Sequence, residues 1–274
     1  MCLIGCSFLL LCCSYVICGN DWSYNDKTQW TGLCATGKQQ SPIDVSFYDL
    51  ERKNIEPLEF HDYNITGEIT GLNNGHTELV QGFESWSTQP YITGGGLQGK
   101  YYLAQFHFHW DGRDNLGSEH TLNHLHYPLE IHLLHVQQGV HPSNADIYPN
   151  SIAVVAVFFE MSDDGTPLEP LTNILRRTIQ TSKESVNEGY NPSDLLPSDT
   201  SSFLYYNGSL TTPPCSETVR WFLMTQPSRV TELQLKRFRV RRGEQSLFLI
   251  DNWRPTQPMN GRKVYLSQTN SIQP

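Results

Sequence analysis

Two histidines one residue apart are placed to bind one metal ion together. His107 and His109 lie in the segment Gln-Phe-His-Phe-His-Trp at 105–110, within an apolar and aromatic run typical of a strand. Side chains alternate between the two faces of a strand, so His107 and His109 point the same way, about 6.6 Å apart along it. Two imidazoles at that separation can converge on one ion.

A third ligand must come from a neighbouring strand. The segment 129–136 contains His132, which shares a face with Glu130 and Leu134, whereas His135 falls on the opposite face. Three neutral imidazoles suit Zn²⁺ and leave a fourth tetrahedral position for water, as in catalytic zinc sites. We therefore predict one zinc ion per chain, bound by His107, His109 and His132.

A second His-x-His pair, His124 and His126, precedes Tyr-Pro in a predicted loop, and composition alone leaves both pairs open. The strand context and two polar neighbours favour the first pair. Gln105 shares the ligand face of its strand, and Glu130 lies two positions before His132 on the same face. Histidine ligands usually donate their other N–H to an amide, carboxylate or carbonyl, and we expect Gln105 and Glu130 to accept these hydrogen bonds.

The elements around these residues are mainly strands. Short apolar stretches bounded by turn residues predict strands at 103–110, 129–136, 152–159, 218–224 and 247–250. Apolar residues spaced by three and four predict a helix over 168–182, and acidic and basic residues at opposite ends favour a second one over 231–238. The pattern predicts one strand-rich domain, mainly β in the α+β sense, with a few peripheral helices.

Composition excludes several partners. The 274 residues contain 28 acidic and 19 basic side chains, a formal net charge of −9. An acidic surface repels nucleic acid, and the shortage of basic residues disfavours binding to anionic membranes. The four arginines within 237–242 are predicted to form a solvated face.

The N-terminus has the features of a secretion signal. Residues 1–20 contain no charged side chain, five of the seven cysteines and about 14 mostly apolar residues in a run, too short for a membrane span. We expect a cleaved signal peptide over 1–19 and a mature domain over 20–274. An uncleaved anchor is the alternative. The polar C-terminus offers no membrane span.

Two cysteines remain after that cleavage. Cys34 and Cys215 form an even count in an oxidising compartment and suggest one disulfide, with two unrelated buried thiols as the alternative. Sequons at Asn64 and Asn207 agree with secretion. Because Asn207 precedes Thr211 by four residues, a glycan there would crowd the expected site.

Seven collinear motifs resemble the α-class carbonic anhydrases of the secreted or extracellular type. The resemblance extends over 22–264. The motifs are Gln-Ser-Pro-Ile-Asp at 40–44, Leu-Asn-Asn-Gly-His at 72–76, Gln-Phe-His-Phe-His-Trp at 105–110, Gly-Ser-Glu-His-Thr at 117–121, Glu-Ile-His-Leu at 130–133, Gly-Ser-Leu-Thr-Thr-Pro-Pro at 208–214 and Asp-Asn-Trp-Arg-Pro at 251–255.

The resemblance implies a fold and an activity. The fold is one domain around a large, twisted, mostly antiparallel sheet of about ten strands with short peripheral helices. The activity is that of a zinc lyase: zinc-bound hydroxide attacks CO₂, giving bicarbonate and a proton, and the reaction is reversible. CO₂ and bicarbonate are then the partners. The sequence leaves the oligomeric state open, with a monomer expected.

The resemblance also implies residue roles. Thr211 would accept the proton of the hydroxide and donate its own to Glu119, Thr212 would contact bicarbonate, and His76 would carry protons to solvent. Tyr24 and Asn74 would order the intervening water. An apolar CO₂ pocket would be lined by Val154, Leu210, Trp221 and Leu134. The pairing of Cys34 with Cys215 matches the disulfide of extracellular members.

Two positions depart from the common pattern of the family. Leu134 stands where many members have valine, and Leu79 stands where several have a polar residue, so both bear on the rate. A catalytically silent relative acting as a binding protein is disfavoured, because such relatives commonly lose the zinc ligands. An enzyme that also serves in an extracellular matrix would be expected to carry long acidic or repetitive tails.

Overall fold

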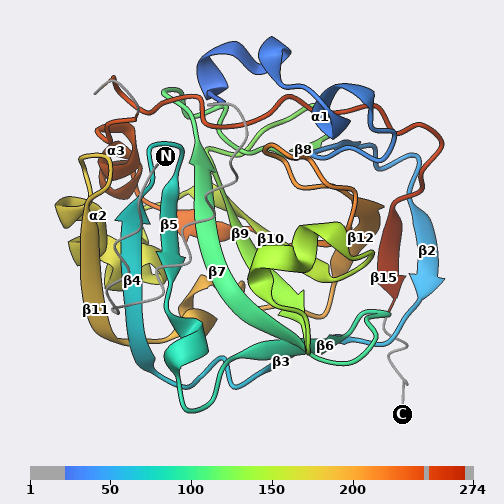
Figure 1. The fold of residues 1–274 in the computed structure, drawn as a ribbon, viewed down its shortest axis with the longest axis horizontal. Coiled ribbons are helices and arrows are strands. Elements are labelled where there is room, and N and C mark those ends of the chain that lie inside the picture. Colours follow the sequence, from blue (N-terminus) through green and yellow to red (C-terminus); the bar gives the residue numbers. More distant parts are fainter. Residues whose placement is uncertain (1–21, 244–246, 269–274) are drawn as a thin grey trace, which may run out of the picture.

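One large sheet organises the chain. The computed structural model describes residues 22–243 and 247–268, so the predicted signal peptide lies outside the described residues. In this part of the chain, thirteen strands form a sheet whose main path runs β11-β4-β5-β7-β9-β10-β13-β12-β15-β2 (Figure 1). Off this path, β14 pairs with β10, β6 pairs with β7, and β3 pairs with β6. A separate two-stranded sheet joins β1 to β8.

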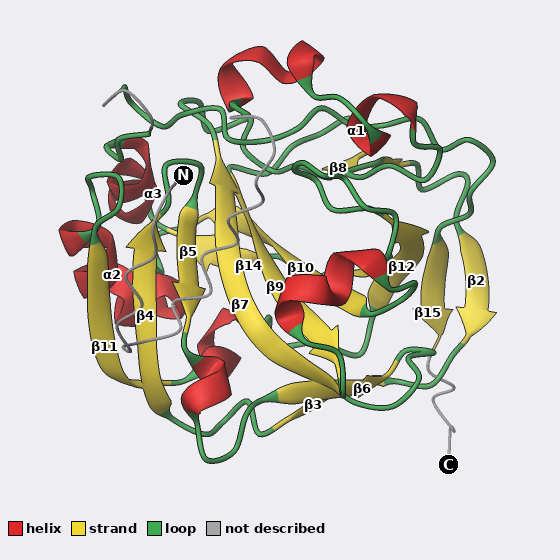
Figure 2. Cartoon of the chain, viewed as in Figure 1, coloured by secondary structure: helices red, strands yellow, loops and turns green. Residues whose placement is uncertain are grey.

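Strands make up most of the regular structure, and the helices are short (Figure 2). The strands are β1 (Asp44–Val45), β2 (Glu51–Asn54), β3 (Leu58–His61), β4 (Gly67–Asn73), β5 (Glu78–Gln81), β6 (Tyr91–Gly94), β7 (Tyr101–Trp110), β8 (Thr121–Leu122), β9 (Leu129–Gln137), β10 (Ile152–Met161), β11 (Glu184–Tyr190), β12 (Phe203–Gly208), β13 (Val219–Met224), β14 (Ser228–Val230) and β15 (Tyr265–Gln268). The α-helices are α1 (Leu33–Thr36), α2 (Thr172–Arg177) and α3 (Glu232–Arg239), and the 3₁₀ helices are η1 (Tyr24–Gln29), η2 (Phe83–Ser85), η3 (Pro142–Ile147), η4 (Thr166–Leu171) and η5 (Pro192–Leu195).

The expected fold class is confirmed. Within the large sheet, only β10–β13, β10–β14 and β15–β2 pair in parallel among the described strands. The strands predicted at 103–110, 129–136, 152–159 and 218–224 are β7, β9, β10 and β13. The helix predicted at 231–238 is α3, which begins with a capping box between Thr231 and Gln234. Each described helix is too short or too polar to cross a lipid bilayer.

Two predicted elements are wrong. Residues 247–250 form no strand: Phe248 makes one isolated bridge, to Arg242. The side chains of Leu247, Phe248 and Ile250 are about half exposed, so this segment is not covered as a core strand would be. The helix predicted over 168–182 is a 3₁₀ segment followed by a short α-helix. Pro170 lacks the N–H that a continuous helix needs, and Thr178 follows the end of the helix with its hydroxyl donating to the Ile174 carbonyl and to the Glu78 carboxylate.

The central strands are buried on both faces. In β10, residues 153, 155, 157 and 159 belong to one apolar cluster, and residues 152, 154, 156 and 158 belong to a second. In β7, residues 106, 108 and 110 pack into the first cluster with α2 and α3, which directs His107 and His109 to the opposite face. The alternation that the sequence suggests therefore separates the core from the candidate ligands.

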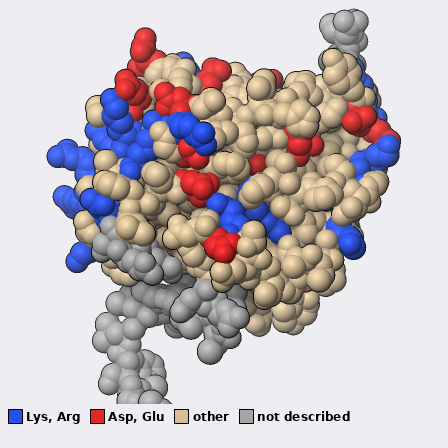
Figure 3. Space-filling view, turned by 90° about the horizontal axis from the view of Figure 1, so that it is seen from above, with Lys and Arg blue, Asp and Glu red and all other residues tan. Residues whose placement is uncertain are grey.

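A buried ion pair ties β5 to the segment after α3. Arg241 and Glu78 are both fully buried, with Arg241 Nε 2.9 Å from Glu78 Oε2. Thr178 donates to the same carboxylate, and Arg241 also donates to the Leu175 carbonyl. The prediction of a solvated arginine face is thus wrong for Arg241. Exposed Lys and Arg side chains do gather at the end of the molecule that carries α2 and α3 (Figure 3).

His135 is a second buried polar group away from the candidate ligands. The Tyr63 hydroxyl contacts Nε2 of His135, and Nδ1 donates to the Ala153 carbonyl at 3.2 Å. Burial lowers the pKa of His135 to about 3. The native state therefore holds the neutral ring, whereas the unfolded chain binds a proton near pH 6.5.

This difference makes the free energy of unfolding fall as the pH drops below 6.5, because only the unfolded state gains the proton. We expect His135 to lower it by about 2 kcal/mol between pH 7 and pH 5. Urea unfolding at both pH values, for the wild type and His135→Gln, measures the difference. Equal losses in the two proteins would contradict the assignment.

Candidate metal centre

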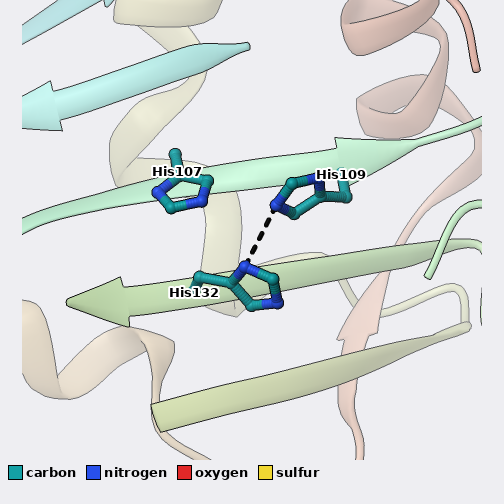
Figure 4. A group of neighbouring side chains, drawn as sticks. All are labelled: His107, His109 and His132. Atoms are coloured by element: carbon teal, nitrogen blue, oxygen red, sulfur yellow. Dashed lines mark hydrogen bonds between the residues drawn. The ribbon is translucent and has the colours of Figure 1, made fainter. Parts of the chain in front are cut away.

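The pairing of β7 with β9 brings three histidines together. His107 lies opposite His132 in the register, and His109 lies opposite Glu130. One ring nitrogen from each of His107, His109 and His132 lies within 4.8 Å of the others. The rings converge from the two neighbouring strands (Figure 4). His109 and His132 are buried, and His107 is partly exposed toward solvent.

Each ring uses its second nitrogen for one acceptor of the protein. The pairs are His107 Nδ1 with Gln105 Oε1 at 2.9 Å, His109 Nδ1 with the Asn252 carbonyl at 2.8 Å, and His132 Nε2 with Glu130 Oε1 at 2.6 Å. The remaining nitrogens are Nε2 of His107, Nε2 of His109 and Nδ1 of His132, and the last two are 3.0 Å apart. Acceptors of this kind fix the tautomer and orientation of a ligating ring.

The three rings are held neutral. Burial, reinforced by the neighbouring rings, lowers the pKa values of His107 and His132, and burial lowers that of His109 to about 4. A neutral imidazole with a free nitrogen is the form that binds a metal ion. The donor set thus fits a divalent transition metal such as zinc.

Glu130 is a fully buried carboxylate that receives four hydrogen bonds. Its Oε2 accepts from the backbone N–H groups of Glu119 and His120, and its Oε1 accepts from His120 Nδ1 and His132 Nε2. Burial alone would raise the pKa of Glu130, but the two histidines outweigh it and hold the pKa well below its usual range. His120, Glu130 and His132 also lie within metal-binding distance, but these hydrogen bonds already occupy the carboxylate.

Glu119 has a buried oxygen without a partner next to the three nitrogens. Its Oε1 accepts from the backbone N–H of Arg254 at 2.7 Å, whereas Oε2 has no hydrogen bond among the described residues. Oε2 lies 3.4 Å from His109 Nε2 and 3.9 Å from His132 Nδ1. Burial raises the pKa of Glu119 to about 7. The nearby Thr211 side chain acts in the opposite direction, because it stabilises the charged carboxylate. A polar group placed between the nitrogens and Glu119 would satisfy this oxygen.

An apolar wall stands beside the histidines. The Trp221 ring lies 4.7 Å from that of His132, and Val154 pairs with both Trp221 and Leu134 across the strands. Leu134 and Leu210 are partly buried and pack against the same cluster.

Leu79 lies opposite His107 on β5. Thr211 is buried and Thr212 is partly exposed, directly after Leu210.

His76 lies on a turn, half-buried beside aromatic rings. Its ring stacks on Trp22 with centroids 4.0 Å apart and lies 6.4 Å from Tyr24. The side chain of Asn74 accepts from the backbone N–H of His76 at 2.9 Å and from that of Thr77 at 2.8 Å. Asn74 therefore shapes the turn that carries His76, a contact the sequence did not indicate.

Asn252 is a site residue that sequence reasoning missed. Its backbone carbonyl accepts from His109, and its side-chain N–H groups donate to the carbonyls of His76 and Phe108, each at 3.0 Å. Its Oδ1 accepts from the Trp110 backbone at 2.7 Å. This one buried amide links the β7 ligands to the His76 turn. Its place in the motif at 251–255 was the available signal.

The predicted disulfide between Cys34 and Cys215 is present. It packs beside Tyr24 and Trp30, so it ties the N-terminal segment to the chain that follows Thr211. Asn207, an exposed residue of β12, follows Tyr206, whose hydroxyl contacts His120 near the centre. Neighbouring residues of a strand face opposite ways, so Asn207 points away from the histidines, and the expectation that a glycan there would crowd the site is wrong.

Comparisons with known proteins agree with this geometry. The model of the eukaryotic-type carbonic anhydrase family matches residues 21–268. The chain is 36% identical to putative carbonic anhydrase 5 of Caenorhabditis elegans over 94% of this chain and 86% of that protein. It is 40% identical to putative carbonic anhydrase 3 of the same organism (89% and 96%) and 34% identical to carbonic anhydrase 7 of Mus musculus (90% and 97%). The chain belongs to the eukaryotic-type carbonic anhydrases, and it catalyses the reversible hydration of CO₂ to bicarbonate.

Proposed function

We propose that His107, His109 and His132 bind a single zinc ion that serves this reaction. The convergence of three neutral ring nitrogens carries the proposal, together with the acceptor held by each ring on its far side. When bound, zinc supplies Lewis acidity that makes hydroxide available near neutral pH. Stopped-flow CO₂ hydration, measured with the zinc content before and after chelation, tests the assignment, and an active zinc-free protein would overturn it.

Glu119 and Thr211 are positioned to orient the attacking oxygen. Glu119 Oε2 has no hydrogen bond among the described residues, so it can accept a hydrogen bond from the Thr211 hydroxyl. While its hydroxyl donates a hydrogen bond to Glu119, the Thr211 oxygen has lone pairs that can accept a hydrogen bond from the nucleophile. This chain directs the lone pair of the nucleophile toward carbon, which is a contribution of positioning.

The apolar wall suits CO₂, which carries no charge and makes weak hydrogen bonds. Val154 and Trp221 are rigidly held on adjacent central strands, and Leu134 and Leu210 extend the same surface. As bicarbonate forms, one C–O bond is made, one C=O π bond of CO₂ is broken, and the negative charge of the attacking hydroxide passes to the product's oxygens. Thr212 is the polar group beside this wall that we assign to bicarbonate.

Each turnover releases one proton, and its removal limits the rate. Recombination near 10¹⁰ M⁻¹ s⁻¹ multiplied by 10⁻⁷ M restricts direct loss to water to about 10³ s⁻¹, and a tenfold faster proton gives about 10⁴ s⁻¹. Higher rates require transfer to buffer through a group that titrates near neutrality, and histidine is that group. We assign this transfer to His76, with Tyr24 and Asn74 bordering the path.

Replacing His76 with alanine is expected to lower kcat at least about tenfold in dilute buffer, since proton release then falls to the direct limit. The value of kcat/KM should stay nearly unchanged, because it reports the steps up to bicarbonate formation. Stopped-flow assays across buffer concentrations measure both. Added imidazole should restore kcat. His141→Ala, an exposed histidine away from the centre, is the control, and equal losses of kcat and kcat/KM would exclude the shuttle role.

We infer that the protein is secreted, with residues 1–19 removed as a signal peptide and glycans on Asn64 and Asn207. The Cys34–Cys215 disulfide and the exposure of both asparagines support this. Expression in a eukaryotic secretory host should yield protein in the medium that begins near residue 20 and loses mass on glycosidase treatment. Retention of the intact N-terminus inside the cells would contradict the inference.

A further inference from the structure

A cavity of about 720 Å³ lies at the edge of the sheet formed by β12, β15 and β2. This edge is opposite the one that carries α2 and α3 (Figure 1). The walls carry five basic side chains and no carboxylate: Lys38, Lys53, Arg220, Arg262 and Lys263. Such a concentration of positive charge stands out in a chain with a net charge of −9.

Most of these cations lack acidic partners. Lys263 pairs with Glu51 at 3.1 Å, and Glu217 lies close enough to Arg262 to affect its pKa. Arg220 donates to the neutral side-chain amide of Asn207 at 2.7 Å. Two carboxylates against five cations leave about three positive charges uncompensated.

The two remaining lysines are exposed. The Lys53 ammonium lies 4.9 Å from the ring centre of Tyr265, and neither Lys38 nor Lys53 pairs with a carboxylate among the described residues. Both can therefore turn toward a bound anion without breaking an ion pair.

Two stacked aromatic rings form part of the cavity wall. Tyr205 lines the cavity, is 5% exposed and stacks on Tyr265 with ring centroids 5.1 Å apart. Its hydroxyl is buried and makes no hydrogen bond among the described residues. Because this hydroxyl is buried, it does not face the cavity, so the two stacked rings contribute a rigid wall and no hydrogen-bond donor.

We propose that this cavity binds a polyanion that carries two or more sulfate or phosphate groups. Its volume is in the range of sites for ligands with many heavy atoms, and its cations are spread over several segments, so a single small anion would contact few of them. Arginine and lysine are the side chains that recognise such oxyanions.

The cavity is separate from the metal centre. Tyr206 lies between them: it lines the cavity, Arg262 lies over its ring, and its hydroxyl contacts His120 on the side of the centre. A ligand in the cavity would therefore leave the CO₂ wall open.

Two probes distinguish the sources of such an anion. Inorganic triphosphate represents phosphate chemistry, and a heparin-derived hexasaccharide represents sulfate groups on a sugar chain. Each is titrated calorimetrically into the mature protein, both as secreted and as produced without glycans in a bacterial periplasm, because Asn207 lines the cavity. We expect saturable binding of at least one probe that weakens as salt rises. Preference for the triphosphate indicates a phosphate ligand, and preference for the hexasaccharide indicates a sulfated sugar.

The variant Lys38→Gln/Lys53→Gln/Arg220→Gln is expected to bind at least about tenfold more weakly. Its matched control, Arg176→Gln/Arg229→Gln/Lys236→Gln, has the same net charge but changes exposed side chains outside the cavity. The control should bind within about twofold of the wild type. Both variants should hydrate CO₂ normally, which verifies their folding. Absence of binding by both probes, or equal weakening in the two variants, would overturn the proposal.

Discussion

His107→Ala is expected to lower kcat/KM for CO₂ hydration at least about 10³-fold and to remove most of the bound zinc. Lewis-acid stabilisation by a catalytic metal is worth several kcal/mol, and about 4 kcal/mol corresponds to that factor. His107 is the ligand to replace, because its far nitrogen bonds to Gln105 and its loss leaves the hydrogen bonds of Glu130 intact. Stopped-flow hydration and metal analysis of the same preparation measure both effects.

His124→Ala is the matched control for this experiment. His124 belongs to the competing His-x-His pair, is exposed and contacts Asp44 at 2.8 Å. Its replacement should leave the zinc content and the activity unchanged. If the loss of zinc followed His124→Ala and not His107→Ala, the metal would have to be assigned to the other pair.

Arg241→Met is expected to lower the free energy of unfolding by about 3–5 kcal/mol, because it leaves the Glu78 carboxylate buried without its cation. Burial already raises the pKa of Glu78 with the arginine in place. The double variant Glu78→Leu/Arg241→Met removes both charges and should recover much of the loss, as an apolar pair of similar volume often replaces a buried ion pair without penalty. Urea unfolding of the two variants and the wild type measures this.

Lys236→Met gives the comparison at the surface. It breaks the exposed ion pair in which Lys236 Nζ lies 2.6 Å from Glu232 Oε1. The free energy of unfolding should change by less than about 0.5 kcal/mol. A loss of similar size for Arg241→Met would mean that burial gives the Glu78 pair no special weight. If the double variant were no more stable than Arg241→Met, the loss of stability would be due to altered packing and not to the unpaired Glu78 carboxylate.

Local pattern was enough to predict the central strands. In β7, aromatic residues alternate with His107 and His109, and the register of β7 against β9 places His132 opposite His107. Period-two alternation survives in the fold because both faces of the strand are covered and a shift by one residue would bury the ligands in the core. The three candidate ligands, their neighbours Gln105 and Glu130 and the mostly β fold class were predicted from this kind of information, whereas the roles of Glu119, Thr211 and His76 came only from the resemblance.

Contacts between distant segments could not be read in the same way. Arg241 lies among four arginines that look solvated, yet its partner Glu78 is 163 positions away. Asn252 donates to a carbonyl 176 positions earlier. Residues 247–250 have the composition of a strand, but among the described residues they make only one isolated bridge, from Phe248 to Arg242. Such outcomes depend on tertiary packing, which overrides local preference.

The four hydrogen bonds of Glu130 tie catalysis to the integrity of the scaffold. Two of them hold the backbone of Glu119 and His120 in place, and a third orients His132. Replacing Glu130 in order to install another reaction would therefore remove the hydrogen bonds that hold the backbone of Glu119 and His120, as well as the one that orients His132. Redesign should begin at His107, which is partly exposed, and should leave Glu130 and its hydrogen-bond partners Glu119, His120 and His132 unchanged.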